Sequence, residues 1–138
     1  MKMRSLLFVP GDSEKKFAKA RDAGADVLIL DLEDSVAPSM KDEARGIVTG
    51  WLDQAADVPA SLFVRINPLD TGLTLADLAA VVRPGLVGIL VPKANGGHDI
   101  QRIGNYLSAL EEKAGMAVGT VKIAVVCTET PAAMFALG

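Results

Sequence analysis

Acidic side chains gather in the stretch "VLILDLEDSV" (27–36), where Asp31, Glu33 and Asp34 directly follow four consecutive branched aliphatic residues. Clustered carboxylates repel one another and are costly to desolvate, so such a cluster usually holds a cation or accepts protons. The aliphatic run is typical of a buried strand, which places the charges where that strand ends. We expect Asp31 to face solvent or to cap the following turn, and we leave it out of the predicted site.

Further charged residues follow other apolar runs. Arg65 ends "SLFVR", Lys93 ends "LVGILVPK" and Glu129 ends "VKIAVVCTE". A single charge at a strand end means little, but acids beside a permanently charged guanidinium suit a divalent cation together with a carboxylate ligand. We therefore predict that Glu33, Asp34, Arg65 and Glu129 form one site, and Lys93 stays open between ligand contact and an ion pair with a neighbouring acid.

The elements that must position these residues alternate along the chain. Continuous runs rich in Val, Ile and Leu are typical of parallel strands covered on both faces, and they lie at 5–10, 25–32, 61–67, 86–93 and 121–129. Helical periodicity predicts helices between them, at 13–24, 39–55, 74–82 and 99–115, and a fifth helix beginning at 130–138.

Helix ends carry recognisable signals. Ser39 and Asp42 are placed as a capping pair, and Gly115 is a plausible stop. Thr130 and Pro131 fit the first turn of the fifth predicted helix.

The alternation of strands and helices permits two architectures, an open doubly wound sheet or a (β/α)8 barrel. In both, a ligand binds at the carboxyl ends of the strands. The charged residues at the predicted strand ends are therefore the candidate site in either case.

Composition excludes several classes of protein. The chain has 138 residues and a formal net charge of -3, which argues against a nucleic-acid binder. No apolar run approaches the roughly 20 residues of a membrane span, and the first apolar run is too short for a signal peptide, so we expect a cytoplasmic protein. The single cysteine, Cys127, excludes an internal disulfide and a multi-cysteine zinc site.

Several motifs occur together in a characteristic order: "RSLLFVPG", "LILDLEDSV" followed by Lys41, Ala44 and Arg45, then "VRIN", "ILVPK" and "TET". In order and spacing they resemble the citrate lyase beta-subunit branch of the HpcH/HpaI aldolase and citrate lyase family. The resemblance covers essentially the whole given chain.

This resemblance implies a TIM barrel of the phosphoenolpyruvate/pyruvate type that uses Mg2+ in carbon-carbon lyase chemistry. The implied substrate is a 3-hydroxyacyl thioester, such as citryl-, malyl- or citramalyl-CoA, carried on coenzyme A or an acyl-carrier protein. The resemblance also implies a homo-oligomer, a trimer or hexamer.

Residue roles follow from the same resemblance. Glu129 resembles the family's metal-ligand glutamate, and Arg65 resembles the arginine that holds the substrate carboxylate and oxyanion. The acidic pair Glu33 and Asp34 resembles the pair that holds metal-bound water. Arg4 and Lys15 lie where related lyases meet the coenzyme.

A complete barrel needs eight strands and about 250 residues, whereas five strands are predicted here. We therefore expect residues 1–138 to be the amino-terminal part of a single barrel domain. The resemblance implies a second metal ligand, an aspartate, beyond Gly138. Two alternatives stay open: a flavodoxin-like receiver module that binds Mg2+, and a noncatalytic subunit of the lyase family. A receiver would need an acidic pair after the first strand and an aspartate after the third, and neither is present.

Overall fold

The computed structural model describes residues 5–92, 97–126 and 134–137. The strands are β1 (Leu6–Pro10), β2 (Val27–Asp31), β3 (Ser61–Arg65), β4 (Gly88–Val91), β5 (Lys122–Val126) and β6 (Met134–Leu137). The helices are α1 (Glu14–Arg21), α2 (Lys41–Asp53), α3 (Thr74–Val81) and α4 (Gly97–Lys113), with short 3-10 turns at Pro38–Met40, Ala55–Asp57 and Leu69–Thr71.

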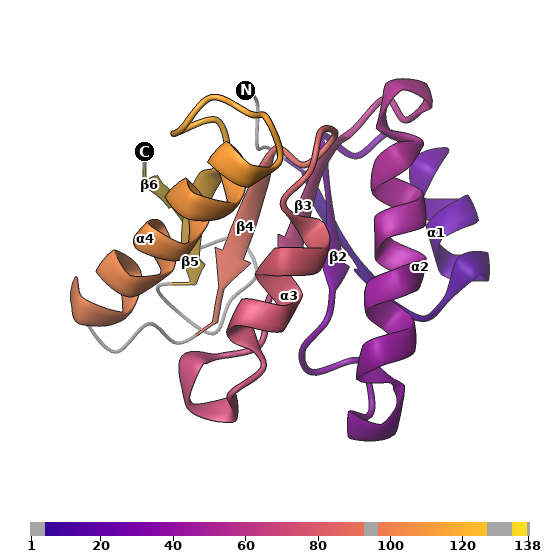
Figure 1. Cartoon of the computed structure of the whole chain (residues 1–138). Coiled ribbons are helices and arrows are strands. Elements are labelled where there is room, and N and C mark those ends of the chain that lie inside the picture. The colour runs from indigo at the N-terminus through magenta and orange to yellow at the C-terminus, as the bar shows by residue number, and fades with distance from the viewer. Residues whose placement is uncertain (1–4, 93–96, 127–133, 138) are drawn as a thin grey trace.

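The strands form one sheet in the order β1-β2-β3-β4-β5-β6, in which the first five are mutually parallel. Each parallel strand therefore lies beside its predecessor in the chain, and helices cover the sheet from one side (Figure 1). A doubly wound sheet would carry helices on both faces, and a flavodoxin-like module would have the order 2-1-3-4-5. The observed order is that of a barrel wall and is not that of the receiver alternative.

Two apolar clusters lie on opposite faces of the sheet because alternate residues of a strand point to opposite faces. The larger cluster joins the helices to the sheet and includes Trp51, whose ring stacks on Phe17 with centroids 4.4 Å apart. The smaller cluster consists of strand residues and their immediate neighbours, and we call its side the lumen face: Val27, Ile29, Phe63, Leu90 and Ala124, with Leu6 and Val87 packed against them.

Glycine is needed on the lumen face where the Phe63 ring crosses β4. A Cβ added at Gly88 would lie 2.5 Å from Cε2 of Phe63, closer than atoms can approach. The lumen face is thus closely packed at the middle of the sheet, and at the carboxyl ends of β2 and β3 it carries the charged residues Asp31 and Arg65.

The predicted fifth helix is wrong for Met134–Leu137, which forms β6 and pairs antiparallel with β5. A short apolar run such as "MFAL" does not distinguish helix from strand, and the free edge of β5 offers unpaired backbone groups that a strand can satisfy. Thr130 and Pro131, the predicted cap and first turn, lie outside the described residues.

The predicted capping pair at Ser39 and Asp42 is also wrong. Ser39 lies in the 3-10 turn Pro38–Met40, and the residue before α2 is Met40, which makes no side-chain cap. Asp42 instead forms an ion pair with Arg45, one turn later in the helix.

The predicted stop at Gly115 is confirmed. Its φ of 76° is a left-handed conformation that glycine adopts without strain. Among the described residues, no helix is long and apolar enough to cross a membrane.

Candidate functional site at the carboxyl ends of the strands

The register of the parallel strands places Asp31 and Arg65 side by side at the ends of β2 and β3. Nε of Arg65 donates to Oδ1 of Asp31 at 2.8 Å, and Nη2 donates to Oδ2 at 2.6 Å. Both residues continue the lumen-face alternation of Ile29 and Phe63. The rim of the lumen therefore carries a two-pronged ion pair of the strong, charge-assisted kind.

Asp31 is 1% exposed, so the expectation that it faces solvent is wrong. The alternative expectation, that it caps the following turn, is confirmed. Its carboxylate accepts from the amides of Glu33 at 2.8 Å and Ser35 at 3.0 Å, and from the Ser35 hydroxyl at 2.6 Å. Asp31 thus binds Arg65 and orders the acidic loop at the same time.

These contacts set the charge state of the pair. Burial alone would raise the pKa of Asp31, but hydrogen bonds from Arg65, Ser35 and the Glu33 amide outweigh burial and lower it. Burial alone would lower the pKa of Arg65, but the hydrogen bond and charge of Asp31 raise it. The aspartate is therefore held ionised and the guanidinium permanently charged.

Glu33 lies beside this pair and behaves in the opposite way. Its Oε1 is 3.5 Å from Nε of Arg65, and its side chain is 16% exposed. Burial raises the pKa of Glu33, the charge of exposed Asp34 raises it further, and Arg65 only partly opposes them. Of the two rim carboxylates next to Arg65, Glu33 is thus the better suited to exchange a proton.

The face of Arg65 is covered by an aromatic ring. Its guanidinium carbon lies 4.8 Å from the centroid of Phe8, a residue of β1 that is 39% exposed. Within the described part of the chain, Nη1 makes no hydrogen bond, whereas Nε and Nη2 are taken by Asp31. Arg65 therefore keeps one terminal nitrogen for a ligand, on a side chain that is otherwise fixed.

Not every predicted site residue joins this group. Lys15 is exposed on the first turn of α1 and makes no hydrogen bond or ion pair to another described residue. Arg4, Lys93 and Glu129 lie outside the described residues. The structure thus brings together Glu33 and Arg65, with Asp34 next to Glu33 in the same loop.

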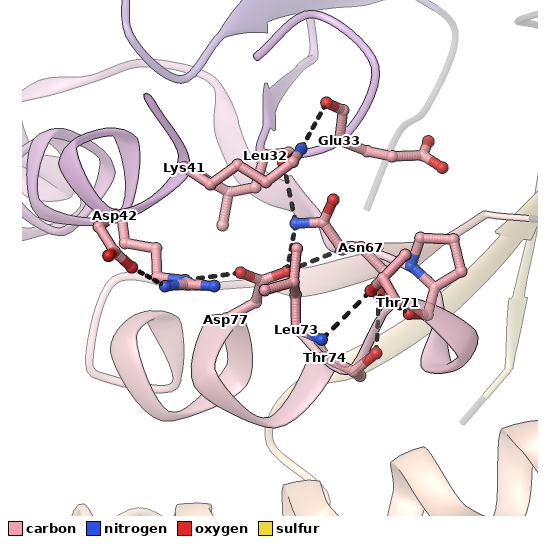
Figure 2. A network of polar contacts seen from close by, with 11 residues as sticks. Leu32, Glu33, Lys41, Asp42, Asn67, Thr71, Leu73, Thr74 and Asp77 are labelled. Carbon is pink, nitrogen blue, oxygen red and sulfur yellow. Dashed lines mark hydrogen bonds and ion pairs between the residues drawn. The ribbon is translucent and has the colours of Figure 1, made fainter. Parts of the chain in front are cut away.

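The sequence prediction missed Asp31 as a partner of Arg65, and it missed a buried polar network behind the acidic loop (Figure 2). In this network Lys41 binds backbone carbonyls of the loop, and Asn67 binds both the loop and Asp77. The available signals were the spacing of Lys41 after the "DLED" run and Asn67 as the last residue of "VRIN", whereas Asp77 stands in no recognised motif.

The carboxylates of the described rim fit the water ligands of a divalent cation better than they fit direct coordination of the ion. In the ranges that the structure describes, no group of three or more His, Cys, Asp or Glu side chains lies close enough to hold a metal. The Asp31 oxygens are already engaged by hydrogen bonds. Glu33 and Asp34 are oxygen donors of the type Mg2+ prefers, and they fit a role of accepting hydrogen bonds from its water ligands.

A sequence model of the HpcH/HpaI aldolase/citrate lyase family matches residues 4–135. The chain belongs to this family. The predicted resemblance is therefore confirmed, and the Asp31–Arg65 rim is that of an HpcH/HpaI family member.

Curated relatives agree with this membership. The chain is 33% identical over 120 residues to citrate lyase subunit beta of Haemophilus influenzae, covering 87% of this chain and 41% of the relative. It is 37% identical over 100 residues to (3S)-malyl-CoA thioesterase of Cereibacter sphaeroides, covering 72% of this chain and 35% of the relative. The chain thus spans roughly two fifths of the length of the curated relatives it matches.

Solved structures support the fold. The magnesium/glyoxylate complex of Haloferax volcanii malate synthase superimposes with a TM-score of 0.79 at 21% identity, over 92% of this chain and 43% of that chain. The protein CitE of Mycobacterium tuberculosis, in complex with magnesium, acetoacetate and coenzyme A, gives 0.54 at 32% identity, over 74% and 38%. The prediction that the chain supplies the first five strands of a TIM barrel is confirmed.

Proposed function

We propose that the polypeptide carrying this chain is a Mg2+-dependent carbon-carbon lyase. It would cleave a 3-hydroxyacyl thioester, such as citryl-, malyl- or citramalyl-CoA, into an acyl thioester and an oxo acid. The observation that carries the proposal is the Asp31–Arg65 pair, which fixes a permanently charged guanidinium beside Glu33 at the lumen rim. Citrate lyase relatives and the CitE complex with magnesium and coenzyme A support it.

The residues of this chain would serve the developing negative charge. Retro-aldol cleavage leaves an enolate and an oxo acid, so donors aimed at the reacting oxygen lower the barrier. Nη1 of Arg65 can donate to that oxygen or to the substrate carboxylate, while Asp31 prevents the guanidinium from swinging away. Glu33, with its raised pKa, can hold a proton near the same fragment.

Bound Mg2+ would supply Lewis-acid stabilisation of the same charge. We propose Glu129 as a direct ligand, with Glu33 and Asp34 accepting hydrogen bonds from its water. Arg4 and Lys15 are proposed contacts for the coenzyme.

A second candidate activity is hydrolysis of the thioester itself, which the (3S)-malyl-CoA thioesterase relatives favour. It would use the same substrate class and the same rim, but it breaks the bond between carbonyl carbon and sulfur. The third possibility is a noncatalytic subunit of a lyase complex.

Product analysis separates these three. The purified natural polypeptide is incubated with malyl-, citramalyl- and citryl-CoA, with Mg2+ or with EDTA. Lyase activity releases an oxo acid and leaves the coenzyme acylated, whereas thioesterase activity releases free thiol without oxo acid. Neither product, from a folded polypeptide with Mg2+ present, would contradict both catalytic proposals.

We further propose that residues 1–138 are the first part of a single barrel domain in a cytoplasmic homo-oligomer, a trimer or hexamer. The described residues form five parallel strands, whereas a barrel has eight. Intact mass tests whether the polypeptide is longer than this chain, and light scattering tests whether it forms a trimer or hexamer. A subunit mass well above 14.4 kDa and an assembly of three or six subunits would agree with it.

A further inference from the structure

Lys41 holds the acidic loop from the helix layer. Its Nζ donates to the carbonyl oxygens of Leu32 at 2.8 Å and Glu33 at 2.9 Å (Figure 2). The amide of Glu33 donates to Asp31 Oδ1 at 2.8 Å. Both backbone polar groups of Glu33 are therefore hydrogen-bonded: the amide to Asp31 on the lumen face, and the carbonyl to Lys41 of α2.

Leu32 connects this loop to the loop that follows Arg65. Its amide donates to the carbonyl of Arg65 at 2.9 Å, and its carbonyl accepts from Nδ2 of Asn67 at 3.0 Å as well as from Lys41. Since Asn67 lies two residues after Arg65, the peptide groups around Glu33 and Arg65 are joined through Leu32. A shift in either loop must displace the other.

The far end of the network is anchored in α3. Asp77 is 0% exposed and accepts from the Asn67 amide at 2.8 Å and from Asn67 Nδ2 at 2.7 Å. The hydroxyl of Thr74 donates to the Asn67 carbonyl at 2.8 Å, and Nε of Arg45 donates to Asp77 at 2.8 Å. Asn67 is therefore held on several of its polar groups and cannot rotate without leaving buried groups unpaired.

We propose that Lys41 is a positioning residue for the lumen rim: through the carbonyls of Leu32 and Glu33 it sets how Glu33 and Arg65 face a substrate. The proposal rests on the proposed function for its catalytic consequence. The network contacts the rim only through the backbone carbonyls of Leu32 and Glu33 among the described residues. Its effect on catalysis would therefore come through the orientation of the Glu33 and Arg65 side chains. Small displacements of groups around a reacting centre are costly in turnover even when substrate binding survives.

The test compares Lys41→Met, which removes the donors at similar length, with Lys41→Arg, which keeps a charged donor. Arg83→Met is the matched control, because Arg83 is also cationic but forms an exposed ion pair with Asp53. Each variant of the natural polypeptide is measured for kcat and KM, for the urea midpoint, and for hydrogen exchange at the backbone amides of residues 33–36.

We expect Lys41→Met to lower kcat by about 10- to 100-fold, with KM changed far less, because such supporting residues typically act at that level. Exchange at residues 33–36 should accelerate while the rest of the chain keeps its protection, and Lys41→Arg should recover part of kcat. Arg83→Met should leave kcat, KM and exchange at residues 33–36 unchanged and should shift the urea midpoint only slightly.

A kcat equal to that of the control, or a loss fully accounted for by a smaller folded fraction, would overturn the proposal. If Lys41→Met does not fold, Lys41→Gln decides, because its side chain is one atom shorter and uncharged: unchanged kcat and unchanged exchange at residues 33–36 in that variant would overturn the proposal. If the wild-type polypeptide turns over no thioester, the proposed function fails, and exchange at residues 33–36 in the variants still decides whether Lys41 holds the loop.

Discussion

Two buried carboxylates, Asp31 and Asp77, each accept from Nε of an arginine at 2.8 Å, yet they lie in different regions of the molecule. Asp31 and Arg65 lie at the strand ends, on the lumen face, beside Phe8, a residue that is 39% exposed. Asp77 and Arg45 lie between α2 and α3, in the layer that covers the sheet. The same ion-pair chemistry therefore serves a candidate site in one region and its support in the other.

The partners of each carboxylate explain the difference. Asp31 accepts hydrogen bonds from two nitrogens of Arg65, and the third nitrogen makes no hydrogen bond to a described residue. Asp77 takes one nitrogen of Arg45, which also bonds Asp42, and Nη2 of Arg45 is buried without a hydrogen-bond partner among the described residues. The rim pair thus keeps a donor near a surface that a ligand can reach, whereas the unused donor of the helix-layer pair is enclosed.

Of the variants considered, Arg45→Met should lower the free energy of unfolding the most. It leaves the fully buried carboxylate of Asp77 without its cation, and breaking such a pair costs about 3–5 kcal/mol. Urea unfolding of the natural polypeptide measures the loss. If the free energy of unfolding falls by less than in the control Arg83→Met, the hydrogen bonds from Asn67 alone are enough to stabilise the buried Asp77 carboxylate.

The second prediction is for Arg65→Met, which should lower turnover and, because it leaves buried Asp31 without its cation, should lower stability as well. Removing a donor to a developing oxyanion typically costs about 10²–10³ in kcat. Steady-state kinetics on the proposed lyase reaction measure the loss, with Arg83→Met as the control that also loses an arginine. Turnover within a few-fold of the control would remove Arg65 from the site.

The third prediction concerns pH and the two neighbouring acids of the rim. The pKa of Glu33 is raised, so the folded state binds its proton more tightly and this contribution to stability is lost as pH rises through the folded pKa. The pKa of Asp31 is lowered, so its contribution is present at neutral pH and is lost as pH falls through the folded pKa.

The variant Glu33→Gln tests the raised pKa of Glu33. Relative to wild type, it should gain stability as pH rises just above the ordinary pKa of a glutamate, and wild type and variant should run parallel at higher pH. Urea midpoints across this range measure the difference. A difference of the opposite sign would mean that Arg65 stabilises the Glu33 carboxylate more than burial destabilises it.

The smallest effect is expected for Arg83→Met. Its ion pair with Asp53 has side chains 38% and 58% exposed, and exposed pairs typically contribute less than about 1 kcal/mol. Urea unfolding in low and high salt checks this. If Arg83→Met lowers the free energy of unfolding as much as Arg45→Met does, burial does not explain the difference between the Arg45–Asp77 and Arg83–Asp53 pairs.

Much of the fold could be predicted from the sequence because local patterns determine it. The Val-, Ile- and Leu-rich runs predict each parallel strand, and the charges after them predict Glu33 and Arg65 at one edge of the sheet. β6 could not be predicted, because its four apolar residues pair with the edge of β5 only once that edge exists.

Asp31 and the buried network could not be predicted for a related reason. A strand buried on both faces has no alternation that shows where Asp31 points, and only the register places it level with Arg65. Lys41, Asn67 and Asp77 come from separate segments and meet only when α2 and α3 pack on the sheet.

The proposed lyase reaction depends on the charge of Arg65, which Asp31 holds in place to stabilise the developing negative charge. A double-mutant cycle on kcat tests it most directly, using Asp31→Asn, Arg65→Met and the double variant of the natural polypeptide. We predict that the double variant is no slower than Arg65→Met alone, because Asp31 acts through Arg65. Losses that multiply would show that the two residues act independently and would contradict the account.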